Sequence, residues 1–322
     1  MRVLSDDDVA SLLDLEDLLP EIERAFRKQG RGEVERPNRP HFPVGTGLDG
    51  DDPLGTGLTM PAYIHGDDYY TTKLASVHEG NAERSLPTVQ AQITVTDART
   101  GEPAGYLAGT RVTNARTGCI GGLTADWLAV GDGPVTVGLV GAGTQARWQT
   151  RAIVAARGVE SVRVYSPSDS REACAADLRA EGIDAEAVDS AREAASGVDV
   201  VVTATTATEP VFPGDALSPG TLVVAVGAYT TEMRELDGET VSRAARLFAD
   251  VPAEAAETGD FPDHDTSALT PLSAVFEGDA GRESEEEVLV VASVGSAVLD
   301  AAAATALFDA AIAENVGTEV EL

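Results

Sequence analysis

Lys73 is the side chain in this sequence best suited to proton transfer. The chain has 23 basic residues, and only Lys28 and Lys73 among them are lysines. Lys73 lies within residues 69–77, an apolar stretch with a β pattern. The ordinary alternative is a solvent-facing lysine on a strand, but a chain that has lost nearly all its lysine gives little reason to keep one there. Because burial makes the charged form costly, we expect a shifted pKa and a role in proton exchange.

Two arginines, Arg39 and Arg116, could bind a carboxylate together with this lysine. Arg39 lies in a proline-rich loop, residues 36–40, and Arg116 lies in the segment 113–118. A guanidinium binds a carboxylate through two parallel hydrogen bonds, and a lysine of lowered pKa can give or take a proton. These groups would suit a small amino, keto or imino acid. Spacing alone leaves open whether they converge, and a surface ion pair is the alternative for each arginine.

A glycine-rich motif at residues 141–146, Gly-Ala-Gly-Thr-Gln-Ala, follows one predicted strand and opens a predicted helix. This is the G-x-G-x-x-A form of the dinucleotide fingerprint. Its first glycine, Gly141, permits a tight turn, and Gly143 lets the backbone approach a pyrophosphate at the helix N-terminus. Ala146 allows close packing of the helix on the strand. The alternative is a glycine turn in a methyltransferase or in an α/β domain without a ligand.

The position that reads the ribose follows the second strand of this region. An acidic residue there would bind the ribose hydroxyls of NAD, but the chain has Ser166 at that place. Ser168 and Arg171 could bind a 2′-phosphate, so the sequence favours NADP(H) over NAD(H). Asp169 is the feature that argues the other way, because it could turn back to the ribose.

Metal chemistry and disulfide bonding have little support. The four histidines show no spacing typical of a metal site, so we expect none; they are His41, His65, His78 and His264. Two cysteines, Cys119 and Cys174, are too few for a disulfide framework and fit a reducing cytoplasm. The acidic start does not read as a signal peptide, and no apolar run is long enough to cross a bilayer.

Acidic residues dominate the charge of the chain. There are 54 of them against 23 basic ones, giving a net charge of −31, and they are spread along the sequence. This composition resembles the acidic, lysine-poor surfaces of proteins from salt-accumulating halophiles. It argues against nucleic acid or an anionic membrane as a partner, while a basic protein partner is the alternative. The 322 residues suggest two domains or one large α/β unit, and 43% hydrophobic residues argue against disorder.

The secondary-structure elements that must position these residues show two patterns, one before residue 135 and one after it. Residues 6–28 predict one helix, 30–58 a loop, 59–110 an antiparallel sheet and 113–130 a long helix. From residue 135 onward, uninterrupted apolar strands alternate with helices, which is typical of a parallel sheet covered on both faces. We expect strands at 135–140, 162–165, 199–203, 222–226, 245–251 and 288–292, and helices at 147–156, 171–181 and 297–313.

Taken together, these segments resemble the ornithine cyclodeaminase/μ-crystallin family over nearly the whole chain. The matching segments are 60–63, 73–76, 81–90, 113–117, 141–146, 226–228, 234–237 and 293–295. The resemblance implies an α/β fold with two domains. Residues 1–115, completed by 295–322, would form an α+β substrate and dimerisation domain, and residues 116–294 a Rossmann domain that binds NAD(P). It also implies a homodimer.

The resemblance further implies roles for individual residues. Arg39 and Arg116 would hold the substrate carboxylate, Lys73 would be the catalytic residue beside the reacting carbon, and Val294 would lie near the substrate. By the same matching, the cofactor site would include Thr88, Arg116, Gly141, Gly143, Thr144, Gln145, Ala146, Ser166, Ser168, Arg171, Thr205, Val226, Gly227 and Ser293.

Two departures from the family pattern narrow the expected activity. Family members that cyclodeaminate ornithine, and the archaeal alanine dehydrogenases, carry an aspartate where this chain has Tyr229. The cyclodeaminases also carry a lysine where Met233 stands. We therefore expect an NAD(P)H-dependent reductase of cyclic ketimines of the pyrroline-2-carboxylate type. The alternatives are alanine dehydrogenase, ornithine cyclodeaminase and a non-catalytic μ-crystallin-like ligand-binding protein.

Overall fold

The chain folds into two compact units in a computed structural model that describes residues 1–84, 86–262 and 265–321. Unit 1 comprises residues 1–116 and 297–322, and unit 2 comprises residues 117–296. The predicted domain boundaries lie within two residues of this division. The predicted α/β fold class is confirmed. No helix in the described part of the chain is long and apolar enough to span a membrane.

Unit 1 is built on a mostly antiparallel sheet. Four strands form its centre: β4 (Gly55–Ile64), β5 (Tyr69–Val77), β6 (Val89–Asp97) and β7 (Pro103–Ala108). This confirms the antiparallel sheet predicted for residues 59–110. The short strands at its margins are β1 (Arg2–Leu4), β2 (Val34–Glu35), β3 (His41–Val44) and β16 (Thr318–Glu319). The prediction of an unbroken loop over 30–58 was wrong, because β2 and β3 both pair with β4.

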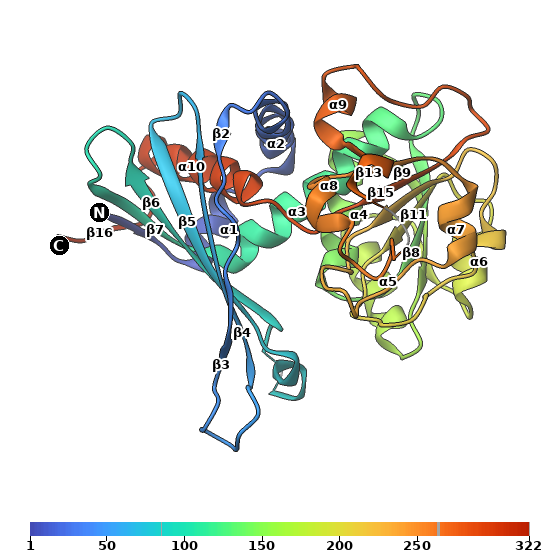
Figure 1. The fold of residues 1–322 in the computed structure, drawn as a ribbon, viewed down its shortest axis with the longest axis horizontal. Helices are drawn as coiled ribbons and strands as arrows, with labels where there is room; N and C mark the ends of the chain where they lie inside the picture. Colours follow the sequence, from blue (N-terminus) through green and yellow to red (C-terminus); the bar gives the residue numbers. More distant parts are fainter. Residues whose placement is uncertain (85, 263–264, 322) are drawn as a thin grey trace. The chain divides into compact units, whose positions relative to one another are not determined.

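Helices cover one face of this sheet (Figure 1). The C-terminal helix α10 (Ala297–Glu314) packs on β4, β5 and α2. The single helix predicted over 6–28 is in fact two, α1 (Asp6–Leu12) and α2 (Leu15–Gly30). The break has a local cause: the Asp14 carboxylate accepts a hydrogen bond from the Glu16 amide at 2.8 Å and caps a new helix. A 3₁₀ turn, η1 (Glu79–Arg84), precedes β6.

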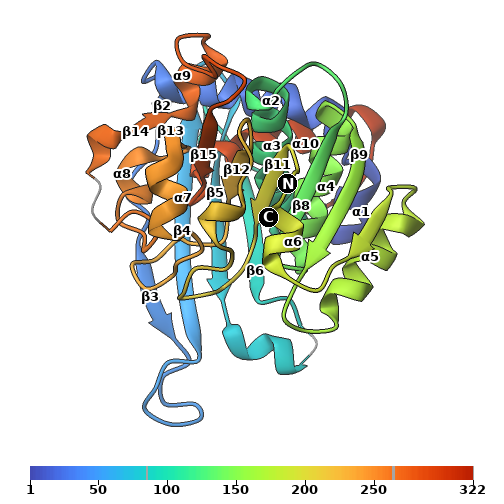
Figure 2. The same cartoon turned by 90° about the vertical axis from the view of Figure 1, so that its right-hand side faces the viewer.

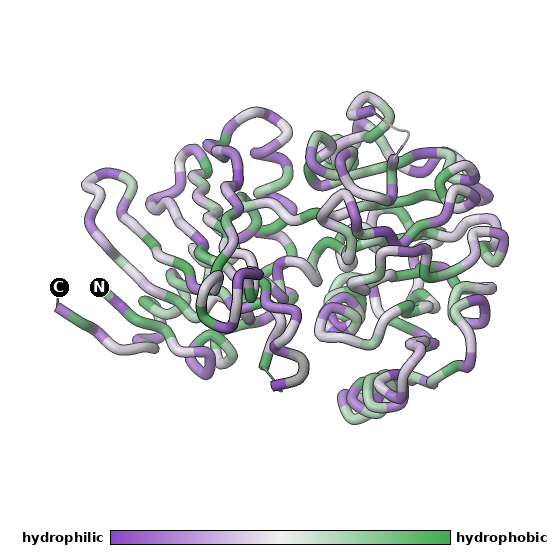
Figure 3. Tube along the Cα trace, turned by 60° about the horizontal axis from the view of Figure 1, so that its bottom comes forward, coloured by the Kyte–Doolittle hydropathy of each residue, from purple (hydrophilic) through white to green (hydrophobic). Residues whose placement is uncertain are grey.

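Unit 2 contains the parallel sheet that the apolar strands predict (Figure 2). Its strand order is β10-β9-β8-β11-β12-β15-β13-β14, and every neighbouring pair is parallel. Hydrophobic residues gather along its interior strands and hydrophilic ones along its loops and turns (Figure 3). The strands are β8 (Val135–Val140), β9 (Val159–Tyr165), β10 (Ala185–Ala187), β11 (Val200–Thr203), β12 (Leu222–Ala225), β13 (Ala244–Ala249), β14 (Leu269–Pro271) and β15 (Val288–Ala292).

Helices connect these strands. The long helix α3 (Gly109–Leu128) leads from unit 1 into unit 2. Close packing of α3 requires a glycine, because a Cβ on Gly118 would lie 2.6 Å from the Trp148 carbonyl oxygen. The other helices of unit 2 are α4 (Thr144–Ala156), α5 (Ser170–Ala180), α6 (Ala191–Ala195), α7 (Gly238–Arg243), α8 (Pro252–Ala255) and α9 (Leu272–Phe276), with 3₁₀ turns η2 (Gly214–Ala216) and η3 (Thr266–Ala268).

Candidate active site

Lys73 is buried in unit 1, with only 2% of the residue exposed. Alternation along β5 places it on the face that α10 covers, together with Thr71. Its register partners in the neighbouring strands are Met60 and Ile93, which are also buried. A lysine among such neighbours cannot keep its full charge without a partner, because desolvation of an ammonium group is costly.

That partner is Asp300, a fully buried carboxylate on α10. Its Oδ2 lies 2.5 Å from Lys73 Nζ, and its Oδ1 accepts a hydrogen bond from Arg116 Nε at 2.8 Å. One carboxylate therefore joins two of the basic residues singled out from the sequence. Nη1 of Arg116 is buried and has no hydrogen-bond partner among the described residues. The cluster of Lys73, Asp300 and Arg116 is called the Lys73 cluster below.

Burial and charge both act on the pKa values in this cluster. Burial lowers the pKa of Lys73 to about 8; Asp300 opposes that shift, and Arg116 and Arg39 add to it. Desolvation disfavours ionised Asp300, but Arg116 and Lys73 together hold its pKa below the ordinary value. Lys73 can therefore exchange a proton near neutral pH while Asp300 stays ionised.

The two remaining unit 1 residues predicted for the site lie in loops. Arg39 is half-buried between β2 and β3, close enough to influence the pKa of Lys73. Thr88 immediately precedes β6, and its carbonyl oxygen accepts a hydrogen bond from the His78 amide at 2.9 Å. Tyr63 lies on the opposite face of the sheet from Lys73, because it is three residues from Met60 in β4 and Met60 pairs with Lys73.

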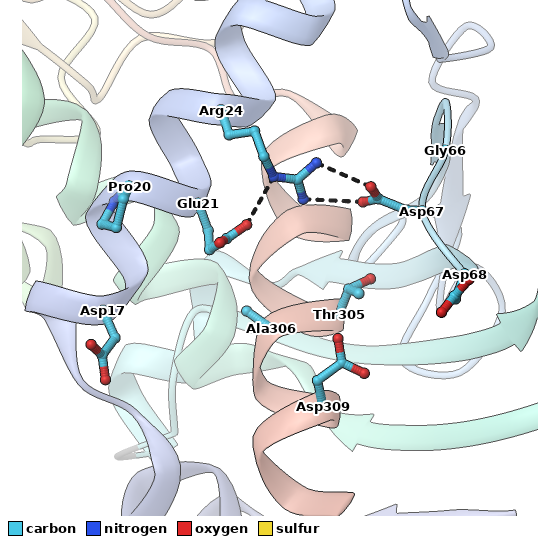
Figure 4. Close-up of a pocket in the computed structure, with 10 residues that line it drawn as sticks. All are labelled: Asp17, Pro20, Glu21, Arg24, Gly66, Asp67, Asp68, Thr305, Ala306 and Asp309. Atoms are coloured by element: carbon cyan, nitrogen blue, oxygen red, sulfur yellow. Dashed lines mark hydrogen bonds and ion pairs between the residues drawn. The ribbon is translucent and has the colours of Figure 1, made fainter. Parts of the chain in front are cut away.

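A separate cavity of about 680 Å³ in unit 1 is acidic and does not include the Lys73 cluster (Figure 4). Arg24 lies within it and pairs with Glu21 at 2.9 Å and with Asp67 at 3.0 Å. Arg24 is the one basic residue among the described residues that line the cavity, and its guanidinium is already paired with these two carboxylates. The lining residues are Asp17, Pro20, Glu21, Arg24, Gly66, Asp67, Asp68, Thr305, Ala306 and Asp309.

In unit 2, the predicted nucleotide residues follow the carboxyl ends of five parallel strands. Main-chain hydrogen bonds continue across this edge beyond the strands: Gly141 donates to Tyr165, Ala204 to Val140, Val226 to Thr203 and Ser293 to Ala225, all at 2.9–3.0 Å. Because parallel strands end at one edge of the sheet, residues distant in sequence meet there. This edge is called the nucleotide edge below.

The glycine-rich turn fits a bound pyrophosphate. Gly141 has φ of +113°, and a Cβ there would lie 2.5 Å from the Ala204 carbonyl oxygen, so the turn requires glycine. Gly143 caps α4 without a side-chain hydrogen bond and has open space above it. Thr144 and Gln145 begin the helix, and Ala146 is buried in its first turn. The first amides of α4 are therefore available to an anion.

Three serine hydroxyls gather after β9. The Oγ atoms of Ser166 and Ser170 are 3.0 Å apart, and those of Ser168 and Ser170 are 2.8 Å apart. Arg171 donates to the Ser166 carbonyl at 3.4 Å and pairs with Asp189 at 3.2 Å. These hydroxyls and the guanidinium are donors of the kind that bind a phosphate. Asp169, the residue that could instead bind the ribose, is exposed at the start of α5.

The remaining predicted residues, Thr205, Val226, Gly227, Ser293 and Val294, lie on the loops after β11, β12 and β15. Two buried acids that sequence reasoning missed bind these loops: Glu235 contacts Thr205 and Gly227, and Asp250 contacts Ser293 and Val294.

Two further expectations concern Tyr229 and metal binding. Tyr229, in place of the family aspartate, is half-buried and packs against the core of unit 2. Within the described residues, no cluster of histidine, cysteine and acidic side chains could hold a metal ion. His264 lies outside the described residues.

Comparison with known proteins gives a consistent set of relatives. A family model described as "Ornithine cyclodeaminase/mu-crystallin family" matches residues 1–315. The alanine dehydrogenase of Archaeoglobus fulgidus is 30% identical over 99% of this chain and 98% of that protein. The Delta(1)-pyrroline-2-carboxylate/Delta(1)-piperideine-2-carboxylate reductase of Azospirillum brasilense is 35% identical over 96% of both chains. The Thermococcus litoralis Delta(1)-pyrroline-2-carboxylate reductase, solved with NADH and L-proline, superimposes with a TM-score of 0.92 at 32% identity, covering 99% of this chain and all of that one.

Proposed function

This chain belongs to the ornithine cyclodeaminase/mu-crystallin family, and we propose that it is an NAD(P)H-dependent reductase of cyclic ketimines of the pyrroline-2-carboxylate class. The observation that carries the proposal is a buried lysine joined to an arginine through Asp300; burial lowers the pKa of this lysine to about 8. It occurs in a chain that shares 35% of its residues with a reductase of this class.

Arg116 and Arg39 would bind the substrate carboxylate. Arg116 uses Nε for Asp300 and retains a buried Nη1 with no partner among the described residues. A carboxylate would supply that partner, and buried donors are rarely left unsatisfied in native structures. Holding the carboxylate fixes the imine beside Lys73 before reaction and removes much of the orientational freedom.

Lys73 would supply the proton that reduction of the C=N bond consumes at nitrogen. With a pKa of about 8, its side chain is mostly an ammonium at neutral pH yet releases its proton far more readily than an ordinary lysine. Asp300 would keep that ammonium in place without competing for the proton, because its own pKa is lowered. Val294 would contact the substrate.

A nicotinamide nucleotide bound at the nucleotide edge would supply the hydride. The open helix terminus at Gly143 fits its pyrophosphate, and Thr205, Val226, Gly227 and Ser293 would line the rest of the site. We further propose a preference for NADP(H), because three serine hydroxyls and Arg171 stand where an acidic residue would favour NAD(H).

The direct test is a substrate panel in molar KCl with NADPH and with NADH. We expect oxidation of the nucleotide with pyrroline-2-carboxylate or piperideine-2-carboxylate and a large loss of kcat in Lys73→Ala. A Lys73→Ala variant with wild-type kcat would contradict the assignment. Alanine dehydrogenase is the second candidate, favoured by the Archaeoglobus relative, and it would use pyruvate with ammonia. Ornithine cyclodeaminase would instead release ammonia and proline from ornithine and NAD, with no lasting reduction of the nucleotide.

The outer face of the unit 1 sheet supports a homodimer. On this face β5 and β6 expose uncharged residues, including Tyr70 and Leu74, which are 39% and 40% exposed. An uncharged face is unusual in a chain of net charge −31, and a second copy of this face would cover it without charge repulsion. Light scattering should give twice the monomer mass, and Leu74→Glu should shift the mass toward the monomer.

We also propose a cytoplasmic setting rich in salt. Cys119 and Cys174 are buried and form no disulfide in the described part of the chain, as in proteins of reducing compartments. At molar salt the Debye length is about 3 Å, which would screen the repulsion among the surface carboxylates.

A further inference from the structure

We propose that Glu235 and Asp250 are positioning residues that hold the loops of the nucleotide edge in their cofactor-binding shape. The inference rests on the proposed function, because it assigns these carboxylates to nucleotide affinity and not to stability alone. Neither side chain is placed where it would contact the cofactor; each acts through the loops that it binds.

Glu235 joins the loops after β11 and β12. Its Oε1 accepts hydrogen bonds from the Thr205 amide at 2.7 Å and the Thr205 hydroxyl at 2.8 Å. Its Oε2 accepts from the Thr203 hydroxyl and from the Gly227 amide, both at 2.8 Å. One buried carboxylate thus fixes two loops that carry predicted cofactor residues.

The approach of these two loops is close enough to restrict the residue at position 227. A Cβ on Gly227 would lie 2.2 Å from the Thr205 carbonyl oxygen and 2.5 Å from Glu235 Oε1. Position 227 therefore requires glycine, because the Glu235 carboxylate holds the loops after β11 and β12 close together there. The backbone amides of Glu235 and Leu236 both donate to Asp260 Oδ1, at 2.6 Å and 2.8 Å, which fixes the segment that carries Glu235.

Asp250 holds the loop after β15 through hydrogen bonds of the same kind. It accepts hydrogen bonds from the Ser293 hydroxyl at 2.7 Å and from the amides of Val294 and Gly295 at 3.0 Å and 2.8 Å. It follows β13, the next strand in the sheet, so the contact crosses between neighbouring strand ends. The two carboxylates together bind three of the loops at the nucleotide edge.

Charged side chains at these positions carry a cost that a purely structural core would avoid. Burial raises the pKa of Glu235 to about 7, against the hydrogen bonds that favour its ionised form. An apolar replacement would remove that cost but would leave the amides of Thr205 and Gly227 without an acceptor. We therefore attribute the presence of a buried carboxylate at position 235 to its hydrogen bonds with the loops after β11 and β12.

The test compares Glu235→Gln and Asp250→Asn with Asp237→Asn in the full chain. Asp237 is a matched control, because it also accepts hydrogen bonds from backbone amides in unit 2. Its amide partners are Gly214 and Thr240, and neither is a predicted cofactor residue. The readouts are the Kd for NADPH and NADH from nicotinamide fluorescence, the split of kcat and KM, and Tm. We expect the Kd to rise about tenfold or more in the first two variants, as for loss of a hydrogen bond to a charged group. kcat at saturating nucleotide should change less than KM.

The Asp237→Asn control should have a lower Tm than the wild type, while its Kd for the nucleotide stays within about twofold of the wild-type value. If all three variants lose Tm alike but keep the wild-type Kd, the two carboxylates are structural and the inference is wrong. If Glu235→Gln fails to fold, the Kd is measured for Thr203→Val instead. This substitution removes one hydrogen-bond donor to Glu235 and keeps the shape of the side chain at position 203. A wild-type Kd in Thr203→Val would overturn the role of Glu235. Failure of the wild-type protein to bind either nucleotide would instead refute the proposed function itself.

Discussion

Replacing Asp300 with asparagine should move the pKa of Lys73 well below 8. The substitution preserves the shape of the side chain and removes the one negative charge of the Lys73 cluster. Asp300 lies 2.5 Å from Lys73 Nζ and 2.8 Å from Arg116 Nε. Its negative charge is the largest influence that raises the pKa of Lys73, against burial and two arginines that lower it.

The structure sets the size of the effect. An opposite charge at this range changes a pKa by roughly 1–3 units, so the pKa of Lys73 should fall from about 8 to roughly 5–7. At pH 7.5 the ammonium fraction would then fall from roughly three-quarters to roughly 3% for a shift of about two units, a loss of about 25-fold. Reduction of a ketimine by the variant should fall by a similar factor and recover as the pH is lowered. Leaving buried cations without a partner should also cost about 3–5 kcal/mol of stability.

The composition of the chain makes this pKa directly measurable. With Lys28 and Lys73 as the only lysines, lysine labelled with ¹³C at Cε gives two side-chain signals in an NMR titration. Lys28 pairs with Glu33 far along the chain from the cluster and serves as the internal reference. The rate of reduction against pH is measured on the same samples.

A matched control lies on the same helix. Asp309 is also an aspartate of α10 but is exposed and lines the acidic cavity, so Asp309→Asn should leave the pKa of Lys73 unchanged. If Lys73 titrates at 8 or above in Asp300→Asn, the electrostatic account of the cluster is refuted. An equal shift in both variants would show a general charge effect and would also contradict it.

Four further predictions follow from the geometry. In the wild type, reduction should fall about tenfold per pH unit above the Lys73 pKa of about 8, because the ammonium form gives the proton, while the reverse oxidation should rise through the same pH; a flat profile from pH 6.5 to 9.5 would exclude Lys73 as the proton carrier. Arg171→Ala should raise the KM for NADPH more than that for NADH, whereas Arg192→Ala, which removes an exposed pair with Asp215, should change neither; equal effects on both nucleotides would contradict a 2′-phosphate site. Gly138→Ala should cost about 1–3 kcal/mol in urea unfolding, because its Cβ would lie 2.1 Å from the Ala194 carbonyl oxygen, and Gly133→Ala, with open space, should be nearly neutral. Tm should rise from low salt to molar KCl because the net charge of −31 becomes screened, and a Tm independent of salt would argue against the halophilic interpretation.

The parallel sheet of unit 2 was predictable because its strands are buried on both faces. Such strands read as uninterrupted apolar runs, as in residues 200–202 and 222–225. The small strands β2 and β3 escaped prediction for the opposite reason. They lie among prolines and glycines and exist through pairing with β4, a contact that local sequence does not record.

The candidate site was predictable only where residue type was unusual. Lys73 stood out because lysine is so rare in this chain. Asp300 did not, although it is the one charged residue in the run 297–308, and a lone acid in an otherwise apolar helix is a signal that could have found it. Glu235 lies inside a family-like segment, 234–237, yet its part in holding two loops depends on contacts with residues 8 to 32 positions away.

The position of α10 has a consequence for the synthesis of the protein. Unit 2 is continuous in the chain, whereas the sheet of unit 1 is completed by residues that follow unit 2. Lys73 therefore emerges from the ribosome more than two hundred residues before Asp300, a delay of roughly 10–50 s at typical translation rates. During that interval unit 2 can already fold around its nucleotide, while the strand that carries Lys73 has neither its covering helix nor its counter-ion. The synthesis of α10 is therefore the step that completes the proposed site around Lys73.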